Sequence, residues 1–268
     1  MATAGSSLRV RPAAVSGLFY PGDPRELDDC VRSLLQGEFP PQARPKALIA
    51  PHAGYVYSGA TAAAGFRLLA GAAGQIERVV LIGPSHRVPF RGLVLPTVDA
   101  FATPLGRIRI DTQGRKELLD LPQVRLADAP HAPEHSLEVE LPFLQVLLGD
   151  FALLPIAAGD ATAAEVAQAL ERAWGDERTL ILVSTDLSHY HSYESARQLD
   201  AATNAAVMKL ASDLDGEQAC GCIGLNGILA AARERRMRIR LEDLRNSGDT
   251  AGDRQRVVGY GAWSLYDV

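Results

Sequence analysis

The chain has 268 residues, 47% of them hydrophobic and 22% charged, a composition typical of a globular protein of one large α/β domain. The formal net charge of -5 leaves no basic surplus, which argues against nucleic-acid binding, and no apolar run reaches the ~20 residues of a membrane helix. The N-terminus lacks the apolar segment of a secretory signal, and three cysteines, an odd number, argue against a disulfide framework. We therefore expect a cytoplasmic protein without membrane or nucleic-acid partners.

The first half of the chain alternates apolar runs with amphipathic segments. Asp23 followed by Pro24 is typical of a helix start, and the apolar spacing extends that helix to about Leu35. We expect residues 1–8 to be a disordered tail and residues 9–268 to be a single domain. The other elements expected here are strands at 47–50, 78–83, 91–96 and 107–110, a helix from Gly59 to about Ala70 capped by Ser58, a helix at 113–119, a loop at 36–44, and a loop with a short strand at 124–134.

The second half repeats this alternation of helices and strands. Leucines at helical spacing predict a helix from Glu134 to Leu148. Because strands alternate with helices along the whole chain, we predict an α/β fold with a largely parallel, mixed-edge sheet and helices on both faces. The remaining expected elements are strands at 152–157, 179–183, 239–244 and 257–266, helices at 161–174, 195–210 and 225–236, and a glycine-rich loop at 246–255.

Three of the expected strands are each followed closely by a histidine. His52 follows the run Ala47–Ala50, His86 follows the run at 78–83, and His189 follows the run at 179–183. In open α/β sheets, ligands bind beyond the carboxyl ends of the strands. Three of the six histidines arriving at this edge therefore indicate one shared site.

His52 and His86 are the strongest candidates for metal ligands, because neutral imidazole commonly binds zinc, iron and copper. The alternative for either residue is a structural histidine that bonds a loop carbonyl. Cys220 is a third candidate, since it lies just before an expected helix, whose positive end favours a thiolate. Cys222 adds a second sulfur two residues later, although a buried cysteine is often only a small hydrophobe.

His189 has a carboxylate three residues before it, Asp186, and this pairing suits a general acid or base. A polar loop end with a satisfied histidine explains the same residues equally well. Four further residues are candidates for a pocket or for supporting the ligands: Tyr55 as a phenol donor, Glu134 and His135 as partners behind the ligands, and Asp249 as a group that orients a ligand or caps a turn.

Motifs of competing functions are missing from the sequence. No Gly-x-Gly-x-x-Gly follows a strand, and no Gly-x-x-x-x-Gly-Lys-Ser/Thr phosphate loop occurs. The Gly-x-Ser-x-Gly turn of serine hydrolases is also absent. Nucleotide binding and serine hydrolysis are therefore disfavoured.

Eight segments in order, from Arg11 to about Tyr266, together resemble the Memo family, which is called AmmeMemoRadiSam system protein B in bacteria and archaea. Their combination is highly specific. The segments are RPAAVSGLFYPGD, APHAGYVYSG, IGPSH, TPLGRIRID, EHSLEVELPFLQ, STDLSHY, ACG and NSGDTAGDRQRVVGY.

This resemblance implies a fold similar to class III extradiol (LigB-type) dioxygenases, whose pocket uses two histidines and a carboxylate. In Memo proteins a cysteine is expected in place of the carboxylate, so the implied metal ligands are His52, His86 and Cys220. His189 falls where the dioxygenases keep an acid–base histidine. This chain departs from the family at Gly224, where a proline is common, and Cys222 could compete as a ligand.

Two functions are compatible with the resemblance. The first is metal-dependent redox or dioxygenase-like chemistry on iron or copper, with zinc possible because a thiolate favours softer ions. His189 would then move a proton, and Tyr55 or Glu134 would position the substrate. The second is a non-catalytic binding or scaffold protein that uses the same pocket for a peptide or protein partner. The bacterial family name also implies a pathway shared with a radical-SAM protein and an AMMECR-type protein.

Overall fold

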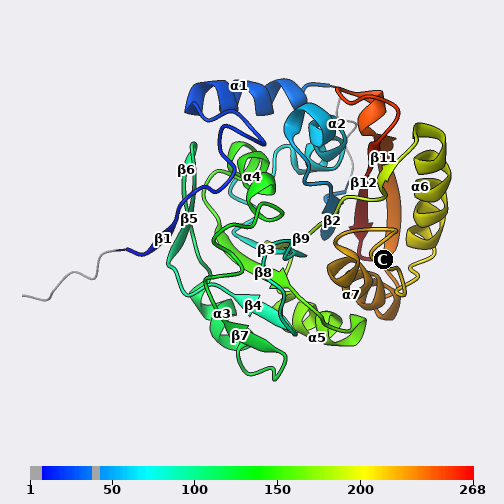
Figure 1. Ribbon diagram of the computed structural model, residues 1–268. Coiled ribbons are helices and arrows are strands. Elements are labelled where there is room, and N and C mark those ends of the chain that lie inside the picture. Colours follow the sequence, from blue (N-terminus) through cyan, green and yellow to red (C-terminus); the bar gives the residue numbers. More distant parts are fainter. Residues whose placement is uncertain (1–7, 38–42) are drawn as a thin grey trace, which may run out of the picture.

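The computed structural model describes residues 8–37 and 43–268 of the chain (Figure 1). The predicted tail, apart from Leu8, and the middle of the predicted loop at 36–44 lie outside the described residues. Within the described part, nine strands form one sheet in the order β10-β12-β2-β9-β3-β8-β4-β7, with β11 paired to β12. The predicted α/β class is confirmed.

The centre of the sheet is parallel. It consists of β2 (Ala47–Ala50), β9 (Thr179–Ser184), β3 (Arg78–Pro84) and β8 (Ala152–Ala158). In β9 and β3, alternate residues face opposite sides of the sheet and contribute to two separate hydrophobic clusters. Both faces are covered, which explains why these strands are continuous apolar runs rather than alternating ones.

The register of these strands brings their carboxyl ends together. Ala50 pairs with Ser184, and Ile82 pairs with Val183 on the other side of β9. The residues that follow each strand therefore emerge side by side at one edge. This is the edge where the sequence predicted a site.

Antiparallel strand pairs flank the parallel centre of the sheet on both sides. On one side, β12 (Val257–Tyr266) runs antiparallel to β2, to β11 (Arg238–Asn246) and to β10 (His189–His191). On the other side, β4 (Leu93–Leu95) is antiparallel to β8 and parallel to β7 (Val124–Leu126). A small separate sheet contains β1 (Val10–Arg11), β5 (Ala100–Thr103) and β6 (Gly106–Arg109).

Helices cover both faces of the main sheet, as predicted. On one face, α1 (Pro24–Leu34), α2 (Tyr55–Phe66) and α4 (Leu141–Leu148) supply one hydrophobic cluster. On the opposite face, α3 (Thr112–Leu118), α5 (Ala163–Ala173) and α7 (Cys222–Glu234) supply the other, and α6 (Tyr193–Met208) packs on β11 and β12. Figure 1 shows α1 and α2 on one side of the molecule and α5 and α7 on the other.

Two predicted helix starts are wrong by four residues or more. Helix α2 begins at Tyr55, four residues before Gly59, and Ser58 lies inside it and donates to the carbonyl of Ala53 rather than capping it. The helix predicted from Glu134 begins only at Leu141, after a 3₁₀ turn, η2 (Glu138–Glu140). Pro142 has no N–H to donate and so suits the first turn of a helix, which explains this start.

All three cysteines are free, in agreement with the expected lack of a disulfide framework. Within the described residues, none of the helices combines the length and the apolar character needed to cross a bilayer.

Candidate metal centre

His52 and His86 follow β2 and β3 directly, and Cys220 reaches the same edge from the loop before α7. One ligand atom from each of the three residues lies within 4.8 Å of the others. The His52 Nε2 and Cys220 Sγ atoms are 3.3 Å apart. The structure thus brings together three side chains that are up to 168 positions apart in the sequence.

Backbone contacts to the loop after β9 fix the position of Cys220. Its N–H donates to the Asp186 carbonyl at 3.2 Å, and the Asp186 N–H points at its sulfur at 3.4 Å. The next residue must be glycine, because a Cβ on Gly221 would lie 2.6 Å from the carbonyl oxygen of Ser184. Burial raises the pKa of the Cys220 thiol to about 12, so the sulfur keeps its proton until a cation replaces it.

His86 is oriented by Glu134. The carboxylate accepts the His86 backbone N–H at 2.6 Å and its Nδ1–H at 2.9 Å, and it also accepts the N–H groups of His135 and Ser136. Burial raises the pKa of Glu134, but these hydrogen bonds, led by that from His86, outweigh it and lower the pKa to about 2. Because a carboxylate can only accept, the proton of His86 sits on Nδ1, and Nε2 keeps a lone pair for a metal.

His52 is almost completely buried, and it is held at both its backbone and its ring. Its N–H donates to Asp186 Oδ1 at 2.8 Å, and its Nδ1 lies 2.7 Å from the hydroxyl of Ser184. Burial and the nearby imidazoles of His135 and His86 lower the pKa of His52 well below its usual value. The ring is therefore neutral, which is the form that binds metals.

His135 completes a cluster of three imidazoles. Its ring stacks on His86, with centroids 4.7 Å apart, and meets the ring of His52 edge-on at 5.3 Å. Burial lowers the pKa of His135 to about 4. His86, Glu134 and His135 are also spaced closely enough for a metal, but the Glu134 oxygens already accept several N–H groups. We therefore interpret Glu134 as a residue that orients His86 rather than as a ligand.

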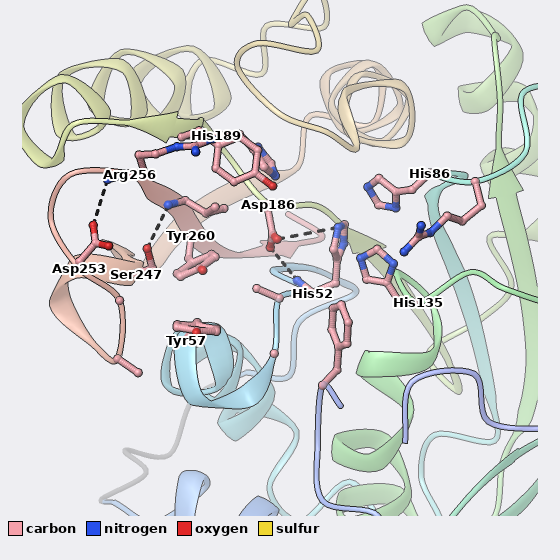
Figure 2. Close-up of a pocket in the computed structure, with 18 residues that line it drawn as sticks. His52, Tyr57, His86, His135, Asp186, His189, Ser247, Asp253, Arg256 and Tyr260 are labelled. Atoms are coloured by element: carbon pink, nitrogen blue, oxygen red, sulfur yellow. Dashed lines mark hydrogen bonds and ion pairs between the residues drawn. The ribbon is translucent and has the colours of Figure 1, made fainter. Parts of the chain in front are cut away.

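These histidines open into a cavity of about 790 Å³ (Figure 2). His189 lines it, and its Nδ1 lies 2.7 Å from the Leu187 carbonyl, so Nδ1 carries the proton and Nε2 is free to accept one. Asp186 also lines it, and burial raises the pKa of this carboxyl to about 7. The rest of the wall combines small residues with four aromatic side chains and three charged ones: Phe19, Tyr57, Tyr190, Tyr260, Arg87, Arg256 and Asp253.

Three of the predicted residues, Tyr55, Glu134 and Asp249, do not line this cavity, and Glu134 lies behind His86 instead. The Tyr55 hydroxyl is buried and donates to the Val139 carbonyl at 2.7 Å, and it is Tyr57 that lines the cavity instead. Residues two positions apart on a helix point in nearly opposite directions, so the two tyrosines cannot both face the cavity. Asp249 accepts from the Tyr193 hydroxyl and from the Asn246 N–H, so it caps a turn.

Cys222 does not join the ligand group, because it is the first residue of α7 and packs against the hydrophobic cluster there. Sequence reasoning missed Ser184 and Glu140, which lie behind His52, and the two arginines of the cavity wall. Ser184 is the last residue of β9, and a polar residue ending an apolar strand at the predicted edge was the available signal.

Comparison with known proteins agrees with this architecture. A family model described as Memo-like protein matches residues 11–264. The chain belongs to the Memo family. Memo relatives include a MEMO1 family protein of Aquifex aeolicus, 36% identical over 94% of this chain and 98% of the relative. Another, from Archaeoglobus fulgidus, is 36% identical over 94% of this chain and 97% of the relative.

A solved structure shares the fold of this Memo protein. It is an uncharacterized protein of Escherichia coli K12, with a TM-score of 0.51 and 14% identity, and the match covers 82% of this chain and all of the other. At this identity the likeness concerns the fold alone. It agrees with the predicted α/β fold class.

The donor set of this Memo protein fits a transition-metal ion. The His52 ring is neutral, the Nδ1 atom of His86 is directed at Glu134, and each of the two imidazoles has a hydrogen-bond partner behind it. Ligand bonds of ~2.0–2.3 Å are typical for such sites, so donors spaced by at most 4.8 Å need only small side-chain shifts to meet on one ion. The sulfur adds preference for softer ions.

Proposed function

We propose that this protein binds a redox-active transition-metal ion, iron or copper, through His52, His86 and Cys220, and that it uses the ion for chemistry on a small molecule in the adjoining cavity. The observation that carries the proposal is the convergence of the three donor atoms within 4.8 Å at the carboxyl edge of the sheet. When bound, such an ion would supply Lewis acidity and electron transfer.

The residues of the chain divide the remaining work. Glu134 keeps the Nε2 lone pair of His86 available, and Asp186 holds the His52 backbone and the Cys220 sulfur in place. His189 lies across the cavity and is not held by the ligand group, so its free Nε2 is suited to accept a proton from a bound molecule. The aromatic wall would exclude water from that molecule.

Elemental analysis after anaerobic purification without a histidine tag tests the metal site. The wild type should contain nearly one equivalent of iron or copper, and His52→Ala and Cys220→Ser should lose it. His191→Ala and Cys222→Ser are matched controls, because neither residue belongs to the ligand group, and both should retain the metal. A wild type that neither contains metal nor takes up added iron(II), copper(I) or zinc(II) would overturn the proposal.

A second candidate function is peptide recognition, and one observation favours it. An apolar cavity of about 460 Å³ adjoins the first and shares Phe19 and Tyr57 with it. Leu18 and Val56 at its rim are 81% and 68% exposed, which is unusual for adjacent large apolar side chains. An extended peptide could place one side chain in each cavity.

The two functions separate in a binding experiment on an array of apolar and acidic peptides. If the cavities recognise a peptide, the double variant Leu18→Ser with Val56→Ser should lose binding, whereas His52→Ala should keep it. If binding depends on the metal, His52→Ala should abolish it too. Absence of any bound peptide would remove this second function.

A further inference from the structure

Behind His52, on the side away from the cavity, lies a fully buried group that none of the proposed chemistry uses. The Ser184 hydroxyl lies 2.7 Å from His52 Nδ1, 2.7 Å from the Ser136 carbonyl oxygen and 2.9 Å from Glu140 Oε1. Ser184 and Glu140 have no exposed surface, and Glu140 Oε2 has no hydrogen-bond partner among the residues that the structure describes. One hydroxyl group thus has three partners.

The number of protons decides how these three contacts are made. A serine hydroxyl has one hydrogen to donate and two lone pairs that accept, and the Ser136 carbonyl can only accept. If Ser184 donates to Ser136, then both His52 Nδ1 and Glu140 Oε1 must donate to Ser184. In that assignment all three contacts are hydrogen bonds, Glu140 is a neutral acid, and His52 carries its proton on Nδ1.

The surroundings of Glu140 support this assignment. If its carboxyl group were ionised, Oε1 would accept one hydrogen bond, from Ser184. Oε2 would then be a buried, charged oxygen without a donor among the described residues, an arrangement that is very costly. Burial raises the pKa of Glu140 well above its usual value. The hydrogen bond with Ser184 lowers the pKa, but by less, and the charge of Asp186 raises it further. The neutral form is therefore the stable one.

We propose that Glu140 is a buried neutral acid that donates a hydrogen bond to Ser184 and thereby keeps the Ser184 hydroxyl hydrogen directed at Ser136. Toward His52, Ser184 then acts only as an acceptor, for the Nδ1–H group. The Nε2 lone pair of His52 is therefore directed at the metal site. Glu140 is a positioning residue that acts through Ser184. For His86 the same task is performed by an ionised carboxylate, Glu134. The metal aspect of this inference rests on the proposed function, but the tautomer does not.

Nitrogen NMR of the metal-free protein with ¹⁵N-labelled histidine tests the tautomer directly. The His52 signals, identified by their loss in His52→Gln, should show protonated Nδ1 and unprotonated Nε2. Ser184→Ala should move the ring toward the Nε2–H form, because the acceptor at Nδ1 is gone. A wild-type His52 with its proton on Nε2 would overturn the proposal, whatever the protein does with metals.

Two substitutions at Glu140 test the neutral acid. Glu140→Gln keeps a donor to Ser184, so the tautomer should be unchanged and metal affinity should stay within about twofold of the wild type. Glu140→Leu removes the donor and should give a mixture of tautomers.

An infrared difference spectrum between wild type and Glu140→Gln should show the band of a protonated carboxyl group, which deuterium shifts. Equal losses of metal affinity in both Glu140 variants would mean that a charge at this position, not a donor, is needed. No loss of metal affinity in either variant would mean that Ser184 sets the tautomer without Glu140. Each result contradicts the proposal.

Metal titration gives the functional consequence. Ser184→Ala should weaken binding by about 10–100-fold, the usual cost of losing a group behind a ligating histidine, and Glu140→Leu should weaken it less. Ser264→Ala is the matched control, because Ser264 is an equally buried strand serine that donates to Glu242 instead. If neither the wild type nor any variant binds metal while the NMR result holds, the proposed function fails but the assignment of the His52 tautomer stands.

Discussion

Glu138 and Glu140 lie two residues apart in one 3₁₀ turn, and both are completely buried, yet their surroundings are opposite. Glu138 forms an ion pair with Arg11 and accepts from the Ala14 and Val15 N–H groups and the Tyr20 hydroxyl. Within the described residues, Glu140 has one hydrogen-bond partner, Ser184. Burial therefore does not determine the charge of a carboxyl group; the number of donors around it does.

The largest effect is expected from breaking the ion pair of Glu138. Arg11→Met would leave a buried carboxylate without its cation and should lower the free energy of unfolding by about 3–5 kcal/mol. Urea denaturation measures this. Arg9→Met is the matched control, because the Arg9–Asp128 pair is about half exposed and should contribute at most about 1 kcal/mol. Similar losses in the two variants would contradict the comparison.

Glu134 extends the comparison to pH. Because its pKa falls to about 2 in the folded state, its ionised form stabilises the metal-free protein by about 3 kcal/mol at neutral pH, and this contribution is lost as the pH falls from 4.5 toward 2. Glu134→Gln should therefore be less stable than the wild type at pH 7, and the two should converge in acid. A difference that does not change with pH would contradict this assignment.

Tyr20 tests how much one donor to Glu138 contributes. Tyr20→Phe removes a hydrogen bond to a charged acceptor and should lower the free energy of unfolding by about 1.5–3 kcal/mol. Tyr55→Phe removes a bond from a buried tyrosine to a neutral carbonyl, that of Val139, and should cost only about 0.5–1.5 kcal/mol. Equal losses would show that Glu138 carries no charge.

Glu140 should show the smallest effect and the opposite pH dependence. Its raised pKa means that the folded wild type binds a proton that the unfolded chain releases, so stability falls as the pH rises above 4.5. Glu140→Gln should differ from the wild type by about 1 kcal/mol or less at pH 4.5 and should become the more stable of the two as the pH rises. A wild type that gains on the variant with rising pH would show that Glu140 is ionised.

The fold and the edge that carries the site could be predicted because they depend on local patterns. The apolar runs before His52 and His86 indicate which residues are buried in the sheet, and the two histidines mark where the chain leaves it. The surroundings of Glu138 and Glu140 could not be predicted, because Arg11 lies 127 positions away from the one and Ser184 lies 44 positions away from the other. Nothing in the local sequence distinguishes the two glutamates, because only the fold brings their partners close.

The placement of β12 has a consequence for the order in which the protein is made. This strand lies beside β2 but comes far later in the sequence, so β2 has no partner on that side until β12 has been synthesised. A domain generally folds as a unit once it has been synthesised, and pairing between strands so far apart in sequence is slow. His52 and His86 are thus made early but acquire the sulfur of Cys220 and the support of the closing strand late. A nascent chain therefore cannot trap a metal ion in a finished site before it has folded.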